Sequence, residues 1–236
     1  MKTRALLVHL FTASGLVPMM LAVDAIWRDQ VYLALIWLGV AMLIDGLDGP
    51  LARRFNVAEH TPQIDGVILD HVIDFTGYCF LPALIIYHFS MVPEDFVVIA
   101  TSYLLVTSLY TFANRAAKTP EYDFRGFPAL WNVVVFYMVV LETGAWLNLT
   151  AIFLLGAMTF VPVRFVHPLR VVSWRCLNAP LVFIWAALVF IYLGVGVTGA
   201  RAALPPLVDI LFLTVSLYFL FLSGWRSWSL RTRGDI

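Results

Sequence analysis

The sequence predicts an all-α fold, a polytopic bundle of about eight transmembrane helices forming a single membrane domain over residues 1–236. Hydrophobic residues make up 61% of the 236-residue chain, charged residues make up 13%, and the mean hydropathy is +0.88. A soluble domain is about 45–50% apolar and about 25% charged. The apolar residues form unbroken runs near the ~20 residues that cross a bilayer as a helix. They do not alternate with polar residues, as they would in a membrane barrel.

Prolines and charged residues divide these runs and mark the ends of the predicted helices. They stand in the segments 27–29, 92–95, 118–120, 167–168 and 205–206. The division near Asn148 has the weakest signal, because two apolar runs almost meet there. We therefore expect helices over residues 6–26, 31–48, 66–89, 96–113, 127–145, 148–166, 178–197 and 206–224.

The distribution of basic residues predicts the orientation in the membrane. Eight spans place both termini on one side, and of the 15 basic residues only Arg28 and Arg201 fall on the other side. Because cytoplasmic loops carry an excess of Lys and Arg, the termini are expected to be cytoplasmic. The loop that follows the second helix is then cytoplasmic as well. The net charge of zero indicates no basic face, and so no nucleic-acid partner.

Four aspartates gather on the two helices that flank this loop. Asp45 and Asp48 are three residues apart, and Asp70 and Asp74 are four apart, so each pair lies on one helical face. Ionisable groups inside membrane helices are costly and usually face an interior cavity. Oxygen ligands suit Mg²⁺, Mn²⁺ or Ca²⁺. Two such ions about 3.5–4 Å apart could bridge a diphosphate and offset charge on both reacting oxygens.

Small residues and one arginine stand between the two aspartate pairs. Gly49, Ala52 and Gly66 remove side-chain bulk, which lets a helix or a flat ligand approach the backbone. The guanidinium of Arg53 is well matched to phosphate oxygens. Asp65 directly precedes the third helix and is predicted to cap it.

These residues form the pattern D-x2-D-G-x2-A-R-x12-G-x3-D-x3-D, which resembles the signature of the CDP-alcohol phosphotransferases. Those enzymes displace CMP from a CDP-linked lipid or alcohol with a second alcohol. The gap of 12 residues between Arg53 and Gly66 is longer than in most members. It is similar to that of one subfamily, the bacterial phosphatidylcholine synthases, which join choline to CDP-diacylglycerol. The segments HLFTASG, AAKTPEYDFRGFPALWN and VPVRFVHP are similar to that subfamily too, so the resemblance covers nearly the whole chain.

The resemblance implies an architecture, a cofactor and a catalytic base. The family's six-helix core would cover about residues 1–166, two additional helices would cover about 178–224, and the enzyme would be a homodimer. Asp45, Asp48, Asp70 and Asp74 would ligate two divalent ions, Mn²⁺ or Mg²⁺. Asp74 would also take the proton from the attacking hydroxyl. The protein would be a phosphatidyltransferase of a bacterial cytoplasmic membrane, with its active site on the cytoplasmic side.

The resemblance also implies contacts to the two substrates. The residues expected at the CDP-diacylglycerol site are Gly49, Ala52, Arg53, Gly66, Lys118 and Arg164. A quaternary ammonium cannot donate a hydrogen bond, so choline is expected against aromatic faces. Tyr78, four residues after Asp74, and Trp131 are the candidates for that contact.

Two other functions stay open at this point. A sibling enzyme could use serine, glycerol phosphate or inositol phosphate as acceptor, because the core motif is shared. A transporter could instead use the intramembrane acids to bind cations, although such sites usually lie near the bilayer midplane. The grouping of the acids at one cytoplasmic mouth favours the enzyme.

Overall fold

A computed structural model describes residues 1–114, 123–161, 163–165, 175–201 and 204–232. The described secondary structure is almost entirely helical, which confirms the predicted all-α membrane fold. Within the residues that the structure describes, six helical segments are long and apolar enough to cross a membrane. They are Lys2–Trp27, Val31–Arg54, Gly66–His88, Glu94–Ala113, Cys176–Thr198 and Pro206–Ser229.

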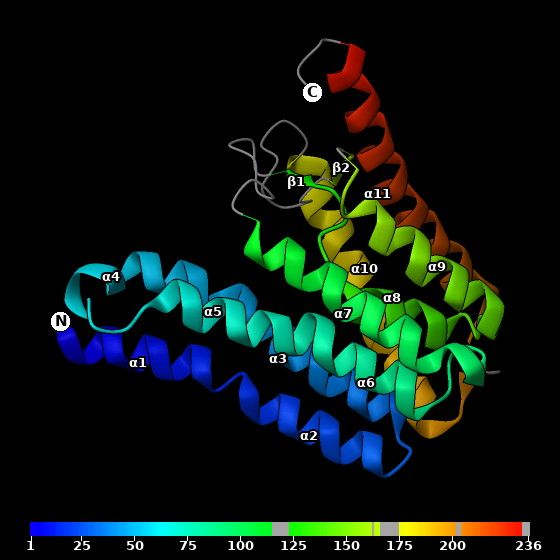
Figure 1. Cartoon of the computed structure of the whole chain (residues 1–236), viewed down its shortest axis with the longest axis horizontal. Coiled ribbons are helices and arrows are strands. Elements are labelled where there is room, and N and C mark those ends of the chain that lie inside the picture. The colour runs from blue at the N-terminus through cyan, green and yellow to red at the C-terminus, as the bar shows by residue number, and fades with distance from the viewer. Residues whose placement is uncertain (115–122, 162, 166–174, 202–203, 233–236) are drawn as a thin grey trace. The chain divides into compact units, whose positions relative to one another are not determined.

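The chain divides into two compact units. The first comprises Met1–Leu105 and Leu130–Leu149, and the second comprises Val106–Ala129 and Thr150–Ile236. The helices of the first unit are α1 (Lys2–Ala13), α2 (Leu16–Trp27), α3 (Val31–Arg54), α4 (Val57–His60), α5 (Gly66–Phe75), the π-helix η1 (Thr76–Phe80), α6 (Leu81–His88), the 3₁₀ turn η2 (Glu94–Phe96), the start of α7 (Val97–Ala113) and α8 (Trp131–Val140). Within this unit α3 packs along both α1 and α2, and α1 also contacts α4 and α5 (Figure 1).

Helix α3 continues six residues beyond the predicted end at residue 48, through Pro50 to Arg54. A proline inside a helix removes one hydrogen bond and usually bends or ends it. Here the last turns are held by packing, because Leu51, Ala52 and Phe55 contact a buried cluster of Ala5, Val8 and Val57. The extension places the whole D-x2-D-G-x2-A-R segment on one helix.

Two predicted helices are interrupted at prolines. The first is divided into α1 and α2 at Ser14 and Gly15, where Pro18 has no amide to donate to the carbonyl of Ser14. The third runs as α5, then the wide turn η1, then α6. Pro82 lies at the start of α6 and cannot donate to the carbonyl of Tyr78, which favours a locally widened helix.

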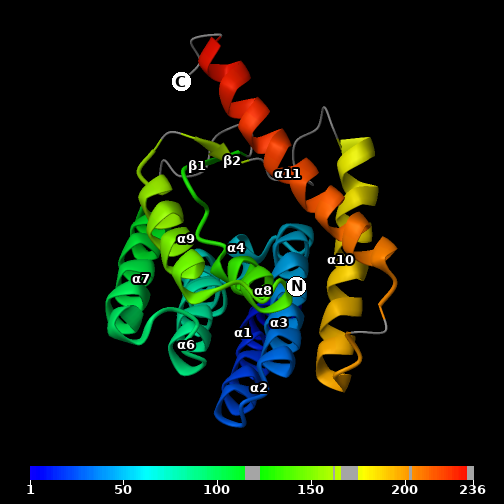
Figure 2. The same cartoon turned by 90° about the vertical axis from the view of Figure 1, so that its right-hand side faces the viewer.

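The second unit contains the end of α7, strand β1 (Phe124–Arg125), most of α9 (Ala145–Met158), strand β2 (Arg164–Phe165), α10 (Arg175–Thr198) and α11 (Pro206–Thr232). The strands form an antiparallel pair, and β2 packs against α11 (Figure 2). Helices α10 and α11 also contact each other.

The predicted fifth and sixth membrane helices, 127–145 and 148–166, are too long. Helix α8 has 10 residues and α9 has 14, so they measure about 15 Å and about 21 Å and fall short of a ~30 Å hydrocarbon core. Gly126 and Ala129 adopt positive φ angles of 82° and 57°, which prevents an earlier start of α8. The end of the predicted sixth helix is instead strand β2.

Candidate active site

Three of the four predicted aspartates meet at one point. Carboxylate oxygens of Asp45, Asp70 and Asp74 lie within 4.8 Å of one another, and all three side chains are partly buried. Asp45 comes from α3, and Asp70 and Asp74 come from successive turns of α5. An all-oxygen donor set of this kind fits a hard divalent cation such as Mg²⁺ or Mn²⁺.

Asp48 lies beside this group and is the most deeply buried of the four aspartates, with 4% of its surface exposed. Thr12 of α1 forms a side-chain hydrogen bond with its carboxylate. Asp48 is not one of the three aspartates whose oxygens gather within 4.8 Å. The structure therefore assembles three of the expected ligands directly, with the fourth held next to them by α1.

A cavity of about 710 Å³ lies against the aspartates and is bounded by α1, α3, α4 and α5. Asp48 and Asp70 both line it. Four residues that the resemblance assigned to the CDP-diacylglycerol site lie on the same wall: Gly49, Ala52, Arg53 and Gly66. A cavity of this size is typical of small-molecule sites.

The loop between the two aspartate pairs is fixed by contacts to α1. The Nε2 atom of His9 lies 3.0 Å from Thr61 Oγ1, and Thr61 in turn donates to the carbonyl of Val57 at 2.9 Å. A Cβ atom on Gly66 would lie 3.2 Å from His9 Cε1, so a glycine here lets the loop approach α1 closely. Specific contacts at Thr61 and Gly66 thus hold this long loop against α1.

His9 and Thr12 are cavity residues that the sequence analysis did not assign. Both lie on the cavity wall, one turn apart on α1. The available signal was the HLFTASG segment, which contains both residues but gives no indication of their partners. Their partners are Thr61 and Asp48, respectively, which are far away in the sequence.

Asp65 caps the helix that carries two of the aspartates, as predicted. Its Oδ1 atom accepts hydrogen bonds from the amides of Val67 at 3.0 Å and Ile68 at 3.1 Å. These bonds satisfy backbone donors that have no partner inside the helix. The cap fixes the start of α5 four residues before Asp70 and thereby helps to position the acids.

Tyr78 contacts the aspartate cluster through its hydroxyl group. The hydroxyl donates to Asp45 Oδ2 at 2.5 Å, and Tyr78 lies in the π-helix η1 directly after α5. Tyr78 was expected near choline because it follows Asp74 by four residues. The bond to Asp45, 33 residues away in the sequence, was not predicted.

The other expected substrate contacts are Trp131, Arg164 and Lys118. Trp131 is the first residue of α8, is 1% exposed and is not part of the cavity wall described above. Arg164 is in β2 and belongs to the second unit. Lys118 lies outside the described residues.

Comparison with known proteins places this site in a family. The family model described as CDP-alcohol phosphatidyltransferase matches residues 5–190, a stretch that contains all four aspartates. The chain belongs to this family. The CDP-alcohol phosphatidyltransferase match begins in α1 and ends in α10, so it includes every helix that borders the cavity.

Curated relatives within the family are also similar over most of this chain. A phosphatidylcholine synthase of Pseudomonas aeruginosa is 41% identical over 96% of this chain and 93% of its own length. A phosphatidylcholine synthase of Mesorhizobium japonicum is 36% identical over 86% of this chain and 79% of its own length. One from Borreliella burgdorferi is 33% identical over 79% of this chain and 80% of its own length.

Proposed function

We propose that this protein condenses choline with CDP-diacylglycerol to give phosphatidylcholine and CMP. The observation that carries the proposal is the group of three carboxylates, Asp45, Asp70 and Asp74, within 4.8 Å of one another beside a 710 Å³ cavity. The curated relatives, which are named phosphatidylcholine synthases, support choline as the acceptor.

Asp45, Asp70 and Asp74 would hold Mn²⁺ or Mg²⁺, most simply as two ions, with Asp48 as a fourth acid at their side. When bound, such ions would supply positive charge that offsets the charge of the diphosphate. Tyr78 holds Asp45 in place through its hydroxyl group, and Thr12 does the same for Asp48.

Asp74 is proposed to act as the general base. Its Oδ1 atom is shielded from solvent, and the residue lies one helical turn after Asp70. Asp74 takes the proton of the choline hydroxyl while that oxygen forms a bond to the β-phosphorus. The bond between this phosphorus and the bridging oxygen breaks, and CMP leaves with the electron pair. Orientation of the reacting groups and charge stabilisation supply most of the rate, as in other phosphoryl transfers.

The cavity wall is proposed to bind the donor lipid. Arg53 would contact phosphate oxygens, while Gly49, Ala52 and Gly66 leave room for the cytidine nucleotide to approach the backbone. Lys118 and Arg164 remain proposed contacts to CDP-diacylglycerol, and Tyr78 and Trp131 remain proposed contacts to choline.

The setting of the reaction is part of the same proposal. The chain would act as one catalytic membrane domain in a homodimer, with its core over about residues 1–166 and two additional helices over about 178–224. It would lie in a bacterial cytoplasmic membrane with both termini and the active site on the cytoplasmic side. The distribution of basic residues supports this orientation.

The test is an acceptor competition with purified protein. The protein is incubated with CDP-diacylglycerol, Mn²⁺ and labelled choline, serine, glycerol 3-phosphate or inositol phosphate, and the label in the lipid product is measured together with CMP. We expect labelled lipid and CMP in equal amounts with choline alone. Transfer to another acceptor, with none to choline, would contradict the proposal.

A further inference from the structure

The two-stranded ribbon of the second unit brings together two segments that the sequence analysis singled out separately. Strand β1 belongs to the segment DFRGF and strand β2 to the segment VPVRF. They pair in antiparallel register, with Phe124 opposite Phe165 and Arg125 opposite Arg164. Residues directly opposite in such a pair place their side chains on the same face. The ribbon therefore presents two arginines side by side.

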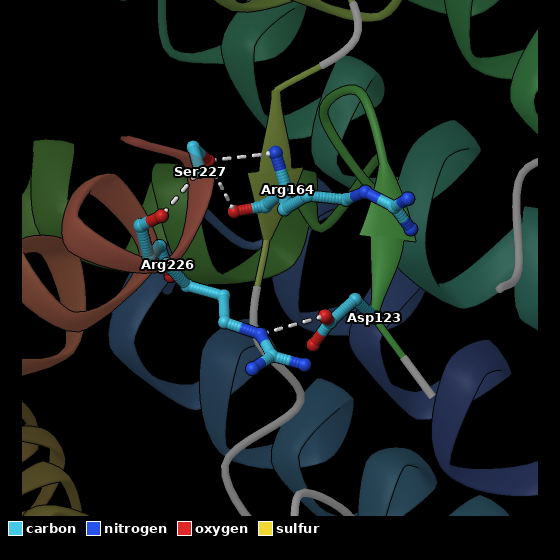
Figure 3. A network of polar contacts seen from close by, with 5 residues as sticks. Asp123, Arg164, Arg226 and Ser227 are labelled. Carbon is cyan, nitrogen blue, oxygen red and sulfur yellow. Dashed lines mark hydrogen bonds and ion pairs between the residues drawn. The ribbon is translucent and has the colours of Figure 1, made fainter. Parts of the chain in front are cut away.

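The ribbon is held firmly at several points. The amide of Gly126 donates to the carbonyl of Val163 at 2.8 Å. The amide of Phe127 donates to the carbonyl of Met158, at the end of α9, at 3.2 Å. Ser227 of α11 accepts from the amide of Arg164 at 2.8 Å and donates to its carbonyl at 3.0 Å (Figure 3). These bonds fix the backbone from which the arginine side chains project.

The guanidinium of Arg164 is buried, and its charge is not balanced by a described neighbour. The residue is 5% exposed, and its Nε and Nη1 atoms have no hydrogen-bond partner among the residues that the structure describes. Figure 3 shows the side chain pointing away from Ser227, while the bond to Asp123 comes from Arg226. A buried charge without a partner is costly, so the position calls for an anion.

The described acids of this unit have other partners. Within its described residues the only carboxylate side chains are those of Asp123 and Asp209. Asp123 is fully buried against Arg226, with a distance of 3.2 Å between Oδ2 and Nε, and Asp209 accepts a hydrogen bond from Tyr192. Neither contact supplies a counter-charge to Arg164.

We propose that Arg125 and Arg164 together form a binding site for a phosphate group. Two guanidinium groups opposite each other repel, and a phosphate between them removes that repulsion and satisfies the buried donors of Arg164. Guanidinium groups and phosphate oxygens form short, charge-assisted, often paired hydrogen bonds. Arg125 is exposed, which gives the ligand a route to the buried partner.

The phosphate could belong to the diphosphate of CDP-diacylglycerol, to an anionic phospholipid of the bilayer or to free phosphate. The first source rests on the proposed function, and the other two do not. All three share one chemistry, a phosphate anion that bridges two arginines. They differ in what the phosphate is attached to, and that difference can be measured.

The experiment uses the full-length protein in a nonionic detergent and a phosphate-free, metal-free buffer. Thermal unfolding is followed by tryptophan fluorescence while inorganic phosphate, phosphatidylglycerol or CDP-diacylglycerol is titrated, with uncharged diacylglycerol as the blank. We expect at least one phosphate compound to raise the unfolding midpoint of the wild-type protein. Arg164→Gln and Arg125→Gln should each weaken its apparent affinity by about tenfold or more, because each removes charge-assisted hydrogen bonds.

Arg28→Gln serves as the matched control, since Arg28 is exposed in the first unit and its ion pair among the described residues is with Asp24, four residues before it. Arg125 is exposed too, so its replacement tests the site even if Arg164→Gln fails to fold. The site is refuted if no phosphate compound stabilises the wild-type protein, or if Arg125→Gln responds like Arg28→Gln. Choline transfer is assayed on the same samples. Binding without transfer contradicts the proposed function alone, and transfer without phosphate binding contradicts this site alone.

Discussion

The aspartate cluster of the first unit and the arginine ribbon of the second unit differ in how their surroundings hold them. Asp45, Asp70 and Asp74 carry like charges and lie within 4.8 Å of one another, and Asp70 lines a cavity. Around the ribbon, Asp123 is buried against Arg226, and Ser227 binds the backbone of Arg164. The first arrangement is unfavourable without a ligand, whereas the backbone of the second is held by internal hydrogen bonds and, among its described residues, only the two opposite arginines call for an anion.

This difference indicates which substitutions should affect turnover and which should affect stability. Removing a charge from the aspartate cluster removes a proposed metal ligand or base, so it should reduce activity. The change also relieves repulsion, so the fold should stay intact. Disturbing the ribbon breaks contacts that hold β1, β2, α9 and α11 together, so it should reduce stability first. Four substitutions test this distinction, beginning with the largest expected effect.

Asp74→Asn tests whether the cluster serves chemistry. The change keeps the shape of the side chain and removes the proposed base, which typically contributes about 10²–10⁴-fold. We expect choline transfer to fall by about that factor while the unfolding midpoint stays constant or rises. Asp95→Asn, at an exposed acid of the same unit, is the control and should retain full activity. A normal rate of choline transfer in Asp74→Asn would contradict the proposal that Asp74 is the general base.

Gly126→Ala tests whether the ribbon serves stability. Gly126 has φ of +82°, and a Cβ atom there would lie 2.3 Å from the carbonyl oxygen of Thr159. We expect a loss of more than about 2 kcal/mol in unfolding free energy, since conformational strain and a backbone clash add. Thermal unfolding measures it. Gly199→Ala shares the positive φ, +69°, but meets no atom within 4 Å, so it should cost only about 1 kcal/mol. Equal losses would show that the clash is relieved.

Tyr78→Phe tests the hydrogen bond that orients Asp45. Losing a bond to a charged group typically costs about 1.5 kcal/mol or more, so the Mn²⁺ concentration for half-maximal activity should rise about tenfold. The KM for choline should change little. Tyr87→Phe, at an exposed tyrosine further along the same chain segment, is the control. A raised choline KM with an unchanged metal requirement would instead support the predicted contact of Tyr78 with choline.

Asp65→Ala tests the cap of α5 and should have the smallest effect. The two amide hydrogen bonds to Asp65 Oδ1 are lost, which costs about 1 kcal/mol at a typical N-cap. We expect a lower unfolding midpoint and a modest loss of activity, because α5 still carries Asp70 and Asp74. Asp65→Asn keeps the acceptor oxygen and should behave nearly as wild type. If Asp65→Asn loses as much stability as Asp65→Ala, the cap contributes through its charge rather than its hydrogen bonds.

Much of the site could be predicted because it depends on spacing along helices. Asp70 and Asp74 were expected on one helical face from their separation of four residues, and Asp45 was expected near them because its helix flanks the same loop. The cap at Asp65 follows from its position before Gly66. Six predicted spans agree with long apolar segments of the described structure: 6–26, 31–48, 66–89, 96–113, 178–197 and 206–224. Both kinds of prediction use information that lies within one or two helical turns, or within one apolar run.

What could not be predicted depends on contacts between distant residues. The bonds of His9 to Thr61 and of Tyr78 to Asp45 join residues 52 and 33 positions apart. Strands β1 and β2 have two residues each, too few to show any alternation. Asp48 is not one of the three gathered aspartates, and its hydrogen-bond partner Thr12 lies on α1, far away in the sequence.

The π-helix η1 also sets the rotation of α6 relative to α5 in the third membrane segment. A π turn contains one residue more than the matching α turn, so it rotates all that follows by about 100° relative to a continuous α-helix. Asp70 and Asp74 precede the turn, whereas the buried residues Leu81 and Ile85 of α6 follow it. If the wide turn closed into an α turn with no residue removed, the packing face of α6 would turn away from its neighbours while the aspartates kept theirs. Deleting one residue between Thr76 and Phe80 would instead let an α turn replace the π turn with both faces kept. The wide turn therefore lets one membrane segment satisfy two requirements. The face of α5 is determined by the aspartates, and the face of α6 is determined by packing.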